Sequence, residues 1–151
     1  MALQLKQAQV DDINLVASLF NEYRIFYNQL SDIEGATNFL YERISKNQSS
    51  IFIAFVDGEP VGFTQLYPIF SSVSLKPALL LNDLYVAENT RKQGVAGALL
   101  EKAKEYGRQK NVGWLLLETA FDNLTAQSLY EKNGWVKQTD FFYQFSLQAS
   151  I

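Results

Sequence analysis

The 151-residue sequence contains no cysteine and no histidine. These absences exclude disulfides, thiolate metal sites, cysteine nucleophiles and histidine bases, and no metal site is expected. Acid–base chemistry must then use carboxylates, tyrosine, lysine, water or the backbone. Long apolar runs are absent too: none approaches about 18 residues, and the initial MALQLKQAQVDD has no signal-like apolar core. We therefore expect a cytoplasmic protein without a membrane partner.

Positive charge is in slight deficit, with 13 Lys and Arg against 16 Asp and Glu and a formal net charge of -3. Nucleic-acid-binding domains usually carry a basic excess, so no nucleic-acid partner is expected. Apolar residues are plentiful: 48% of the chain is hydrophobic and 14% aromatic, which is enough for a sizeable core. No repeat or low-complexity linker divides the sequence, which predicts one domain over residues 1–151.

Apolar periodicity predicts an alternation of strands and helices. The predicted strands cover residues 3–8, 51–56, 60–70, 78–86 and 112–120. The predicted helices cover about 11–27, 31–46, 93–111 and 123–134. The last segment, WVKQTDFFYQFSLQ, is expected to form a hairpin around Thr139-Asp140. The resulting order β-α-α-β-β-β-α-β-α-β-β predicts a mixed α/β fold, with a partly antiparallel central sheet flanked by helices.

The stretch RKQGVAGALL, residues 91–100, places small residues where an apolar helix begins. A helix start offers N–H groups without intrahelical partners and the positive end of the helix dipole. Gly94, Ala96 and Gly97 would let an anion reach those amides, and Arg91 and Lys92 add positive charge. Close packing of the helix on the sheet explains the same small residues about equally well. The stretch lacks the GxxxxGK[ST] and GxGxxG patterns, which disfavours Walker and Rossmann sites.

Asn123 and Tyr130 lie seven residues apart on a predicted short helix. Seven residues make about two turns, so both side chains fall on one face. If Asn123 caps the helix at the end of a buried strand, Tyr130 points toward the same crevice, where open α/β sheets tend to bind ligands. A helix cap and a half-buried core aromatic are the simpler interpretation of the two residues taken alone.

The combination of the two stretches is more specific than either one. LYVAENTRKQGVAGALL followed by LETAFDNLTAQSLYEKNGW resembles the GNAT superfamily of N-acetyltransferases over about residues 80–145. Arg91-x-x-Gly94-x-Ala96 fits that family's Q/R-x-x-G-x-G/A signature. An apolar strand precedes the signature, and N-x-x-A-x-x-x-Y-x-x-x-G-W follows it.

The resemblance implies acetyl-CoA as the acetyl donor. In that family the signature loop binds the pyrophosphate through backbone amides, and the preceding strand splays from its neighbour and binds the pantetheine arm. Asn123 matches the family's pantetheine-contacting asparagine, and Tyr130 matches its tyrosine near the thioester sulfur. The implied acetyl-CoA-binding residues are therefore Leu84, Tyr85, Val86, Arg91, Lys92, Gln93, Gly94, Val95, Ala96, Gly97, Asn123 and Tyr130.

The implied chemistry is direct transfer of the acetyl group to a primary amine within a ternary complex, since no cysteine is present to form an acyl-enzyme. A phenol with an ordinary pKa near 10 can donate to a thiolate whose conjugate acid lies near 8.5, which makes Tyr130 the general acid. Asp83 is the first candidate for the base and Tyr85 the second. Polyamine-acetylating relatives have a pair of carboxylates at this point, whereas this chain has Asn82-Asp83.

The acceptor pocket of such enzymes lies between the first two helices, the splayed strand and the last hairpin. The residues implied to line it here are Glu22, Tyr23, Arg24, Phe26, Tyr27, Asp32 and Asp83. They suggest a small-molecule amine, polyamine-like or amino-acid-like. A non-catalytic acyl-CoA-binding module and a protein lysine or N-terminal acetyltransferase remain alternatives. The final FFYQFSLQ run could pair across a two-fold axis and form a homodimer.

Overall fold

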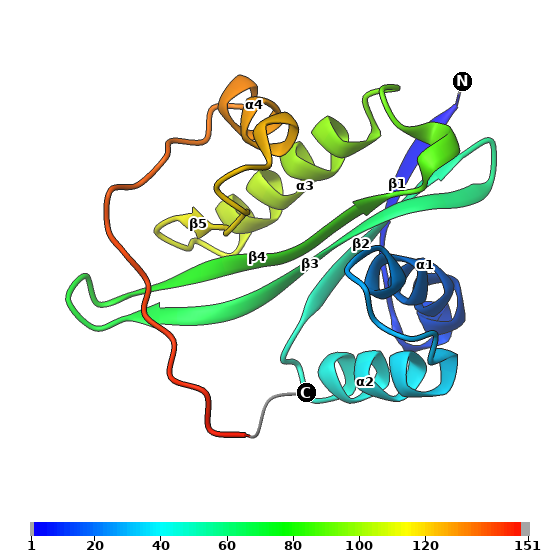
Figure 1. Ribbon diagram of the computed structural model, residues 1–151, viewed down its shortest axis with the longest axis horizontal. Coiled ribbons are helices and arrows are strands. Elements are labelled where there is room, and N and C mark those ends of the chain that lie inside the picture. The colour runs from blue at the N-terminus through cyan, green and yellow to red at the C-terminus, as the bar shows by residue number, and fades with distance from the viewer. Residues whose placement is uncertain (1, 149–151) are drawn as a thin grey trace.

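The computed structural model describes residues 2–148, which form a sheet of five strands in the order β1–β2–β3–β4–β5 (Figure 1). The first four strands are antiparallel neighbours, and β5 joins β4 in parallel. The strands are β1 (Leu3–Gln7), β2 (Ser50–Val56), β3 (Glu59–Ser71), β4 (Lys76–Val86) and β5 (Leu115–Leu116). The helices are α1 (Ile13–Phe26), α2 (Ile33–Ser45), α3 (Val95–Gln109) and α4 (Leu124–Lys132).

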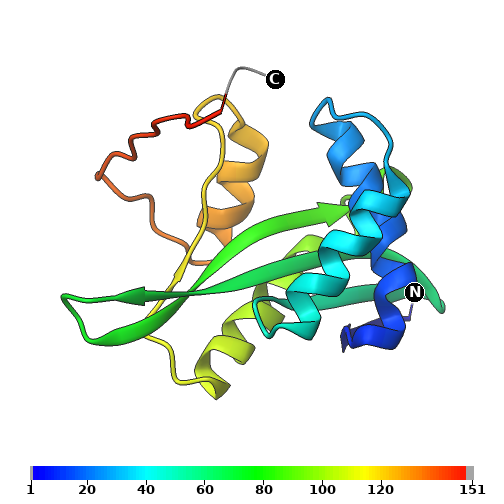
Figure 2. The same cartoon turned by 90° about the horizontal axis from the view of Figure 1, so that it is seen from below.

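Helices cover both faces of the sheet: α1 and α2 lie on one face, and α3 and α4 lie on the other (Figures 1 and 2). Successive side chains of a strand point to opposite faces, so β2 contributes to two apolar layers. Ile51 and Ile53 pack with α1 and α2, whereas Phe52 and Ala54 pack with α3. This three-layer arrangement confirms the predicted mixed α/β class.

The connection between α1 and α2 is held by side chains of α1. Asn21 accepts a hydrogen bond from the Asp32 N–H at 2.8 Å and donates to Ser31 Oγ at 3.0 Å. Arg24 Nη1 donates to the Leu30 carbonyl at 3.2 Å. Asp32 then caps α2, because its Oδ1 accepts from the Gly35 N–H at 2.9 Å. The start of α2 is thereby fixed beside the middle of α1.

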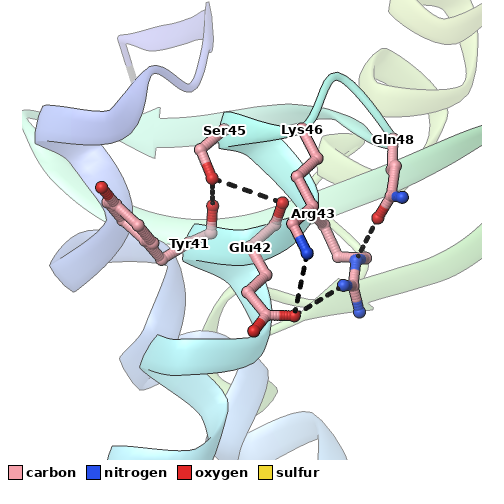
Figure 3. A network of polar contacts seen from close by, with 6 residues as sticks. All are labelled: Tyr41, Glu42, Arg43, Ser45, Lys46 and Gln48. Carbon is pink, nitrogen blue, oxygen red and sulfur yellow. Dashed lines mark hydrogen bonds and ion pairs between the residues drawn. The ribbon is translucent and has the colours of Figure 1, made fainter.

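The other end of α2 carries a surface network (Figure 3). The Arg43 guanidinium contacts Glu42 Oε2 at 2.9 Å and donates from Nε to Gln48 Oε1 at 2.8 Å. Lys46 lies 4.0 Å from the same carboxylate. Exposed ion pairs of this kind contribute between nothing and about 1 kcal/mol each. Their effect here is to fix where the chain leaves α2 toward β2.

Two features of the C-terminal part differ from the sequence-based prediction. The strand predicted at 112–120 is reduced to the two residues of β5, which has β4 on one side and no strand on the other among the described residues. The hairpin predicted around Thr139-Asp140 is wrong, since residues 135–148 contain no strand. Two-residue hairpin turns favour glycine or asparagine at positive φ, and Thr139-Asp140 supplies neither. The segment instead runs extended away from α4 (Figure 1).

Candidate functional site

A β-bulge in β4 shapes the centre of the site. Gln65 of β3 pairs with Asp83, but the next residue, Leu66, pairs with Leu81, so Asn82 has no partner of its own in the register. A bulge changes which face the following side chains point to, and bulges are common beside active sites. Here the bulge puts Asp83 on the α1–α2 side of the sheet, with only 5% of its surface exposed.

The buried Asp83 carboxylate is held by hydrogen bonds. Gln65 Nε2 donates to its Oδ2 at 2.6 Å, and Asn82 Nδ2 donates to its Oδ1 at 3.2 Å. Burial raises the pKa of Asp83, while the hydrogen bonds from Gln65, Tyr23 and Asn82 lower it and offset part of that rise. A carboxylate whose pKa is raised toward neutrality is a stronger general base than an exposed one. Its environment therefore suits the role that the sequence suggested.

Gln65 is a functional candidate that sequence analysis missed. Its side chain is fully buried, and its Oε1 accepts a hydrogen bond from Ser49 Oγ at 2.8 Å. A buried amide whose oxygen and nitrogen both form hydrogen bonds has little freedom to move. Gln65 therefore fixes the position of the Asp83 carboxylate. No sequence motif marks Gln65. Its role follows only from the register of β3 against β4.

Two tyrosines, Tyr23 of α1 and Tyr67 of β3, lie close to Asp83. Burial, followed by the Asp83 charge, raises the pKa of Tyr23 far above its ordinary value, and the same two causes raise the pKa of Tyr67 to about 12. Burial, followed by the neighbouring Tyr27, raises the pKa of Tyr130. All three phenols therefore stay protonated near neutral pH. The fold thus brings Tyr130 of α4 close to Tyr27 at the end of α1.

The predicted splay of β4 from its neighbour is present. β4 pairs with β5 only at Leu79 and Leu80. Leu84, Tyr85 and Val86 pair with β3 on one side and with no strand on the other among the residues that the structure describes. Backbone groups on that open side can bind an extended ligand, as an added strand would. The open side begins at Leu81, so it includes the bulge at Asn82 and the neighbouring Asp83.

The loop between β4 and α3 is anchored by Arg91. Its Nε donates to the Val86 carbonyl at 2.9 Å, and its guanidinium lies over the rings of Phe26 and Tyr85, 5.4 and 5.7 Å from their centroids. Burial raises the pKa of Tyr85, and the adjacent Arg91 lowers it. Arg91 thus ties the loop to β4 and α1, while Lys92 is exposed with a φ of 64°.

The geometry at the start of α3 bears on the two interpretations of the small residues. Gly94 has a φ of 83°, and a Cβ built on it would meet nothing within 4 Å. A Cβ on Gly97 would meet Asn133 Oδ1 at 3.7 Å, an ordinary contact distance. Neither glycine is required for close packing, which disfavours that alternative. The first hydrogen bond of the helix is Ala98 N–H to the Gly94 carbonyl, so earlier N–H groups lack backbone acceptors among residues 2–148.

Both ends of α4 match their predicted caps. Asn123 Oδ1 accepts from the Ala126 N–H at 3.1 Å, and Gly134 follows the helix with a φ of 88°. Tyr130 packs half-buried beside Trp135, with ring centroids 6.3 Å apart, and no hydrogen bond of its hydroxyl is found among the described residues. The phenol group is therefore free to donate to a bound molecule.

A cavity of about 390 Å³ lies between α1, α2 and the bulge. Its lining is Phe20, Tyr23, Arg24, Asp32, Gly35, Ala36, Phe39, Tyr67, Asn82 and Asp83. Four of these were predicted for the acceptor pocket, namely Tyr23, Arg24, Asp32 and Asp83, whereas Phe20, Phe39 and Tyr67 were not. Glu22, Phe26 and Tyr27 are not in the lining. Glu22 instead lies close enough to Tyr85 to raise its pKa, near the Arg91 loop.

A second hollow, of about 530 Å³, lies at the opposite edge of the sheet along β1. It is larger, but its only charged side chain is Lys6, whose Nζ is paired with Asp12 at 2.9 Å. We place the functional site at the smaller cavity, because that one contains the buried carboxylate. Among residues 2–148, no group of three His, Cys, Asp or Glu side chains could hold a metal ion, and no helix is long and apolar enough to cross a bilayer.

Comparisons with known proteins agree with this geometry. The model of the acetyltransferase (GNAT) family matches residues 16–135. An uncharacterized N-acetyltransferase, YhfO, of Bacillus subtilis (strain 168) is 46% identical over 93% of this chain and 95% of its own length. A thialysine N-epsilon-acetyltransferase of Caenorhabditis elegans is 25% identical over 83% of both chains. The crystal structure of a probable acetyltransferase superposes with a TM-score of 0.88 at 39% identity, covering 98% of this chain and 99% of that one. The chain therefore belongs to the GNAT family of acetyltransferases, which are acyltransferase enzymes.

Proposed function

We propose that the protein transfers an acetyl group from acetyl-CoA directly to a primary amine of a small molecule. The observation that carries this proposal is the position of Asp83, a buried carboxylate at the inner end of a small cavity and beside the open side of β4. Acetyl-CoA is the donor of this family. The name of the Caenorhabditis elegans relative says that it acetylates thialysine, a small amine. We propose a cytoplasmic location on the sequence alone.

The residues of this chain fit acetyl-CoA on geometric grounds. The uncovered space at Gly94 and the N–H groups of Val95, Ala96 and Gly97, which lack backbone acceptors, suit a pyrophosphate. The open side of β4 over Leu84–Val86 suits the pantetheine arm. When bound, acetyl-CoA would supply the thioester carbon that the amine attacks and the thiol that leaves. Asn123, Arg91, Lys92 and Gln93 complete the proposed binding residues.

The roles of base, oxyanion donor and acid can be assigned to groups described above. Asp83 takes the proton from the acceptor ammonium, directly or through water, and so frees the lone pair of the amine. N–H groups on the open side of β4 donate to the carbonyl oxygen as negative charge develops there. The attack of the amine forms the carbon–nitrogen bond, and the Tyr130 hydroxyl donates a proton to the sulfur as the carbon–sulfur bond breaks. The nitrogen then loses its second proton, which passes through water to restore the Tyr130 phenol, and Asp83 returns its own proton to solvent.

The test is thiol release from acetyl-CoA with a panel of diamines, amino acids, aminoglycosides and a lysine-containing peptide. We expect turnover with one class of small amine. Turnover with the peptide alone would indicate a protein acetyltransferase. Tight acetyl-CoA binding without turnover on any amine would indicate the non-catalytic acyl-CoA-binding alternative and contradict the proposal.

Gly94→Asn is expected to weaken acetyl-CoA binding by about tenfold to a hundredfold. Asparagine tolerates positive φ better than other side chains, so the fold should lose no more than about 1 kcal/mol. The new side chain would fill the space where the pyrophosphate meets the α3 amides, and losing one or two hydrogen bonds to a charged group accounts for that factor. Calorimetric titration with acetyl-CoA measures the effect.

Gly58→Asn is a matched control for that variant. Gly58 has a φ of 84°, and its Cβ would also meet nothing within 4 Å, but it lies in the β2–β3 turn and is not one of the proposed acetyl-CoA-binding residues. It should lose similar stability in a melting curve and keep wild-type affinity for acetyl-CoA. Equal losses of acetyl-CoA affinity in both variants would contradict a specific role of Gly94 in binding the pyrophosphate.

We also propose that the protein forms a homodimer through residues 141–147. Phe141, Tyr143, Phe145 and Leu147 alternate with other residues, as in a strand with one apolar face, and each is more than 85% exposed. Apolar surface of that extent favours a partner. Sedimentation equilibrium should give twice the mass of the chain for the wild type and a lower mass for Phe145→Ser. A wild-type monomer at all concentrations tested would contradict this proposal.

A further inference from the structure

The cavity between α1, α2 and the β4 bulge carries charge at two separate ends. The inner end lies on the sheet, and its only charged residue is Asp83. At the outer end, where α1 passes the start of α2, Arg24 and Asp32 lie together with Gly35 and Ala36. Aromatic rings make up most of the rest of the lining, which is Phe20, Tyr23, Phe39, Tyr67 and Asn82. A ligand that fills this cavity therefore meets one negative group, an apolar stretch and then a pair of opposite charges.

The outer pair is available for a ligand. Neither Arg24 nor Asp32 forms an ion pair with another residue of the described chain. Arg24 uses Nη1 for the Leu30 carbonyl, which leaves its other N–H groups, and Asp32 uses Oδ1 for the Gly35 N–H, which leaves Oδ2. These two bonds hold both side chains in place at the cavity. An arginine and an aspartate in the lining of one cavity suit a group that carries both a carboxylate and an ammonium.

The walls between the two ends suit an aliphatic stem. Phe20 and Phe39 stack with ring centroids 5.9 Å apart and an angle of 12°, and Tyr23 and Tyr67 flank the approach to Asp83. Apolar contact with such rings is favourable for methylene groups at about 25 cal/mol per Å² of buried surface. A ligand with a second charged group midway along its stem would find no charged partner there, because the aromatic residues of the lining carry no charge.

We infer that the acceptor is a diamino acid, an amino acid whose side chain ends in a primary amine. Its α-carboxylate binds Arg24, its α-ammonium binds Asp32, and its terminal amine reaches Asp83, where it is acetylated. This inference rests on the proposed function and narrows its acceptor. It also assigns a specificity role to Arg24, since diamines and aminoglycosides have no carboxylate to bind there.

L-lysine and cadaverine provide the test, because they share the same stem and terminal amine and differ only in the carboxylate. We expect wild-type kcat/KM, measured by thiol release, to be at least about tenfold higher for L-lysine, the factor expected for one charge-assisted contact. Mass spectrometry of the product should show acetylation of the side-chain nitrogen. Equal kcat/KM values, or a preference for cadaverine, would overturn the inference and leave the proposed function standing.

Arg24→Gln should lower the ratio of kcat/KM for L-lysine over cadaverine at least about tenfold, and Arg24→Glu should invert the preference. Lys46→Gln is the control for loss of a positive charge from the same part of the molecule. Lys46 follows α2, lies 4.0 Å from the Glu42 carboxylate (Figure 3) and does not line the cavity, so its variant should keep the wild-type ratio. An equal drop in the Lys46 variant would overturn the role of Arg24.

A binding measurement separates this inference from catalysis. L-lysine should raise the melting temperature of the wild-type protein in the presence of CoA, and it should do so much less for Arg24→Gln. If no amine is acetylated, the proposed function fails. The change in melting temperature caused by L-lysine then still tests whether the cavity binds a diamino acid. An unchanged melting temperature at millimolar L-lysine would overturn the diamino acid assignment.

Discussion

Asp83→Asn is expected to lower kcat/KM by about a hundredfold to ten-thousandfold, the usual contribution of a general base. The substitution keeps the size of the side chain and its ability to accept the hydrogen bond from Gln65, so the cavity should keep its shape. What is lost is the negative charge that takes the proton from the amine. Thiol release with the best acceptor, measured at saturating acetyl-CoA, gives the effect.

The same variant should be at least as stable as the wild type at pH 8. The folded-state pKa of Asp83 is raised above its unfolded value, because burial disfavours the charged carboxylate. Stability therefore decreases as the pH rises from the unfolded pKa of about 4 through the folded pKa, and above that the penalty is complete. Asparagine carries no such penalty. Its advantage in melting temperature should be largest at pH 8 and should shrink as the pH falls toward 4.

A pH profile tests whether Asp83 is the base. The acidic limb of kcat/KM should report the raised pKa of Asp83, since only the carboxylate form accepts a proton. Gln65→Leu removes a hydrogen bond that lowers this pKa, so the limb should move to higher pH. A purely structural role of Gln65 would reduce stability and leave the limb in place. An acidic limb unchanged in Gln65→Leu, together with near wild-type activity of Asp83→Asn, would remove Asp83 from the mechanism.

Sequence reasoning predicted the elements whose signals are local. The apolar runs of β2 and β4, the cap Asn123 and the glycine Gly134 each depend on a few neighbouring residues, and the structure confirms them. The hairpin predicted at the C-terminus failed, because alternation alone does not supply a partner strand. Residues such as Phe145 alternate correctly and are 86% exposed all the same.

The parts of the site that sequence missed depend on register. Asn82 becomes the extra residue of a bulge only because Gln65 and Leu66 of β3 pair with Asp83 and Leu81. Nothing in either segment alone marks that shift, so the contact of Gln65 with Asp83 could not be predicted. Phe39 falls within the helix predicted over about 31–46, but only the packing of α2 against α1 places it at the cavity.

Tyr130→Phe is expected to lower kcat by about a hundredfold or more and to change the affinity for acetyl-CoA by less than about threefold. The hydroxyl matters only when charge develops on the departing sulfur, whereas the ring packs against Trp135, and phenylalanine keeps that contact. Burial raises the pKa of Tyr130, so the phenol is protonated throughout the neutral range, and loss of activity at alkaline pH should begin above the range of an ordinary tyrosine.

The stability of Tyr130→Phe separates chemistry from folding. The Tyr130 hydroxyl has no hydrogen bond among the described residues, so its removal should change the free energy of unfolding by less than about 1 kcal/mol. Tyr106→Phe is the matched control, because its hydroxyl lies 2.7 Å from Ser50 Oγ on the α3 side of the sheet and takes no part in the proposed chemistry. That variant should lose some stability and keep the wild-type kcat. If Tyr130→Phe keeps it as well, the proton for the leaving thiol comes from another source, and acid catalysis by α4 is excluded.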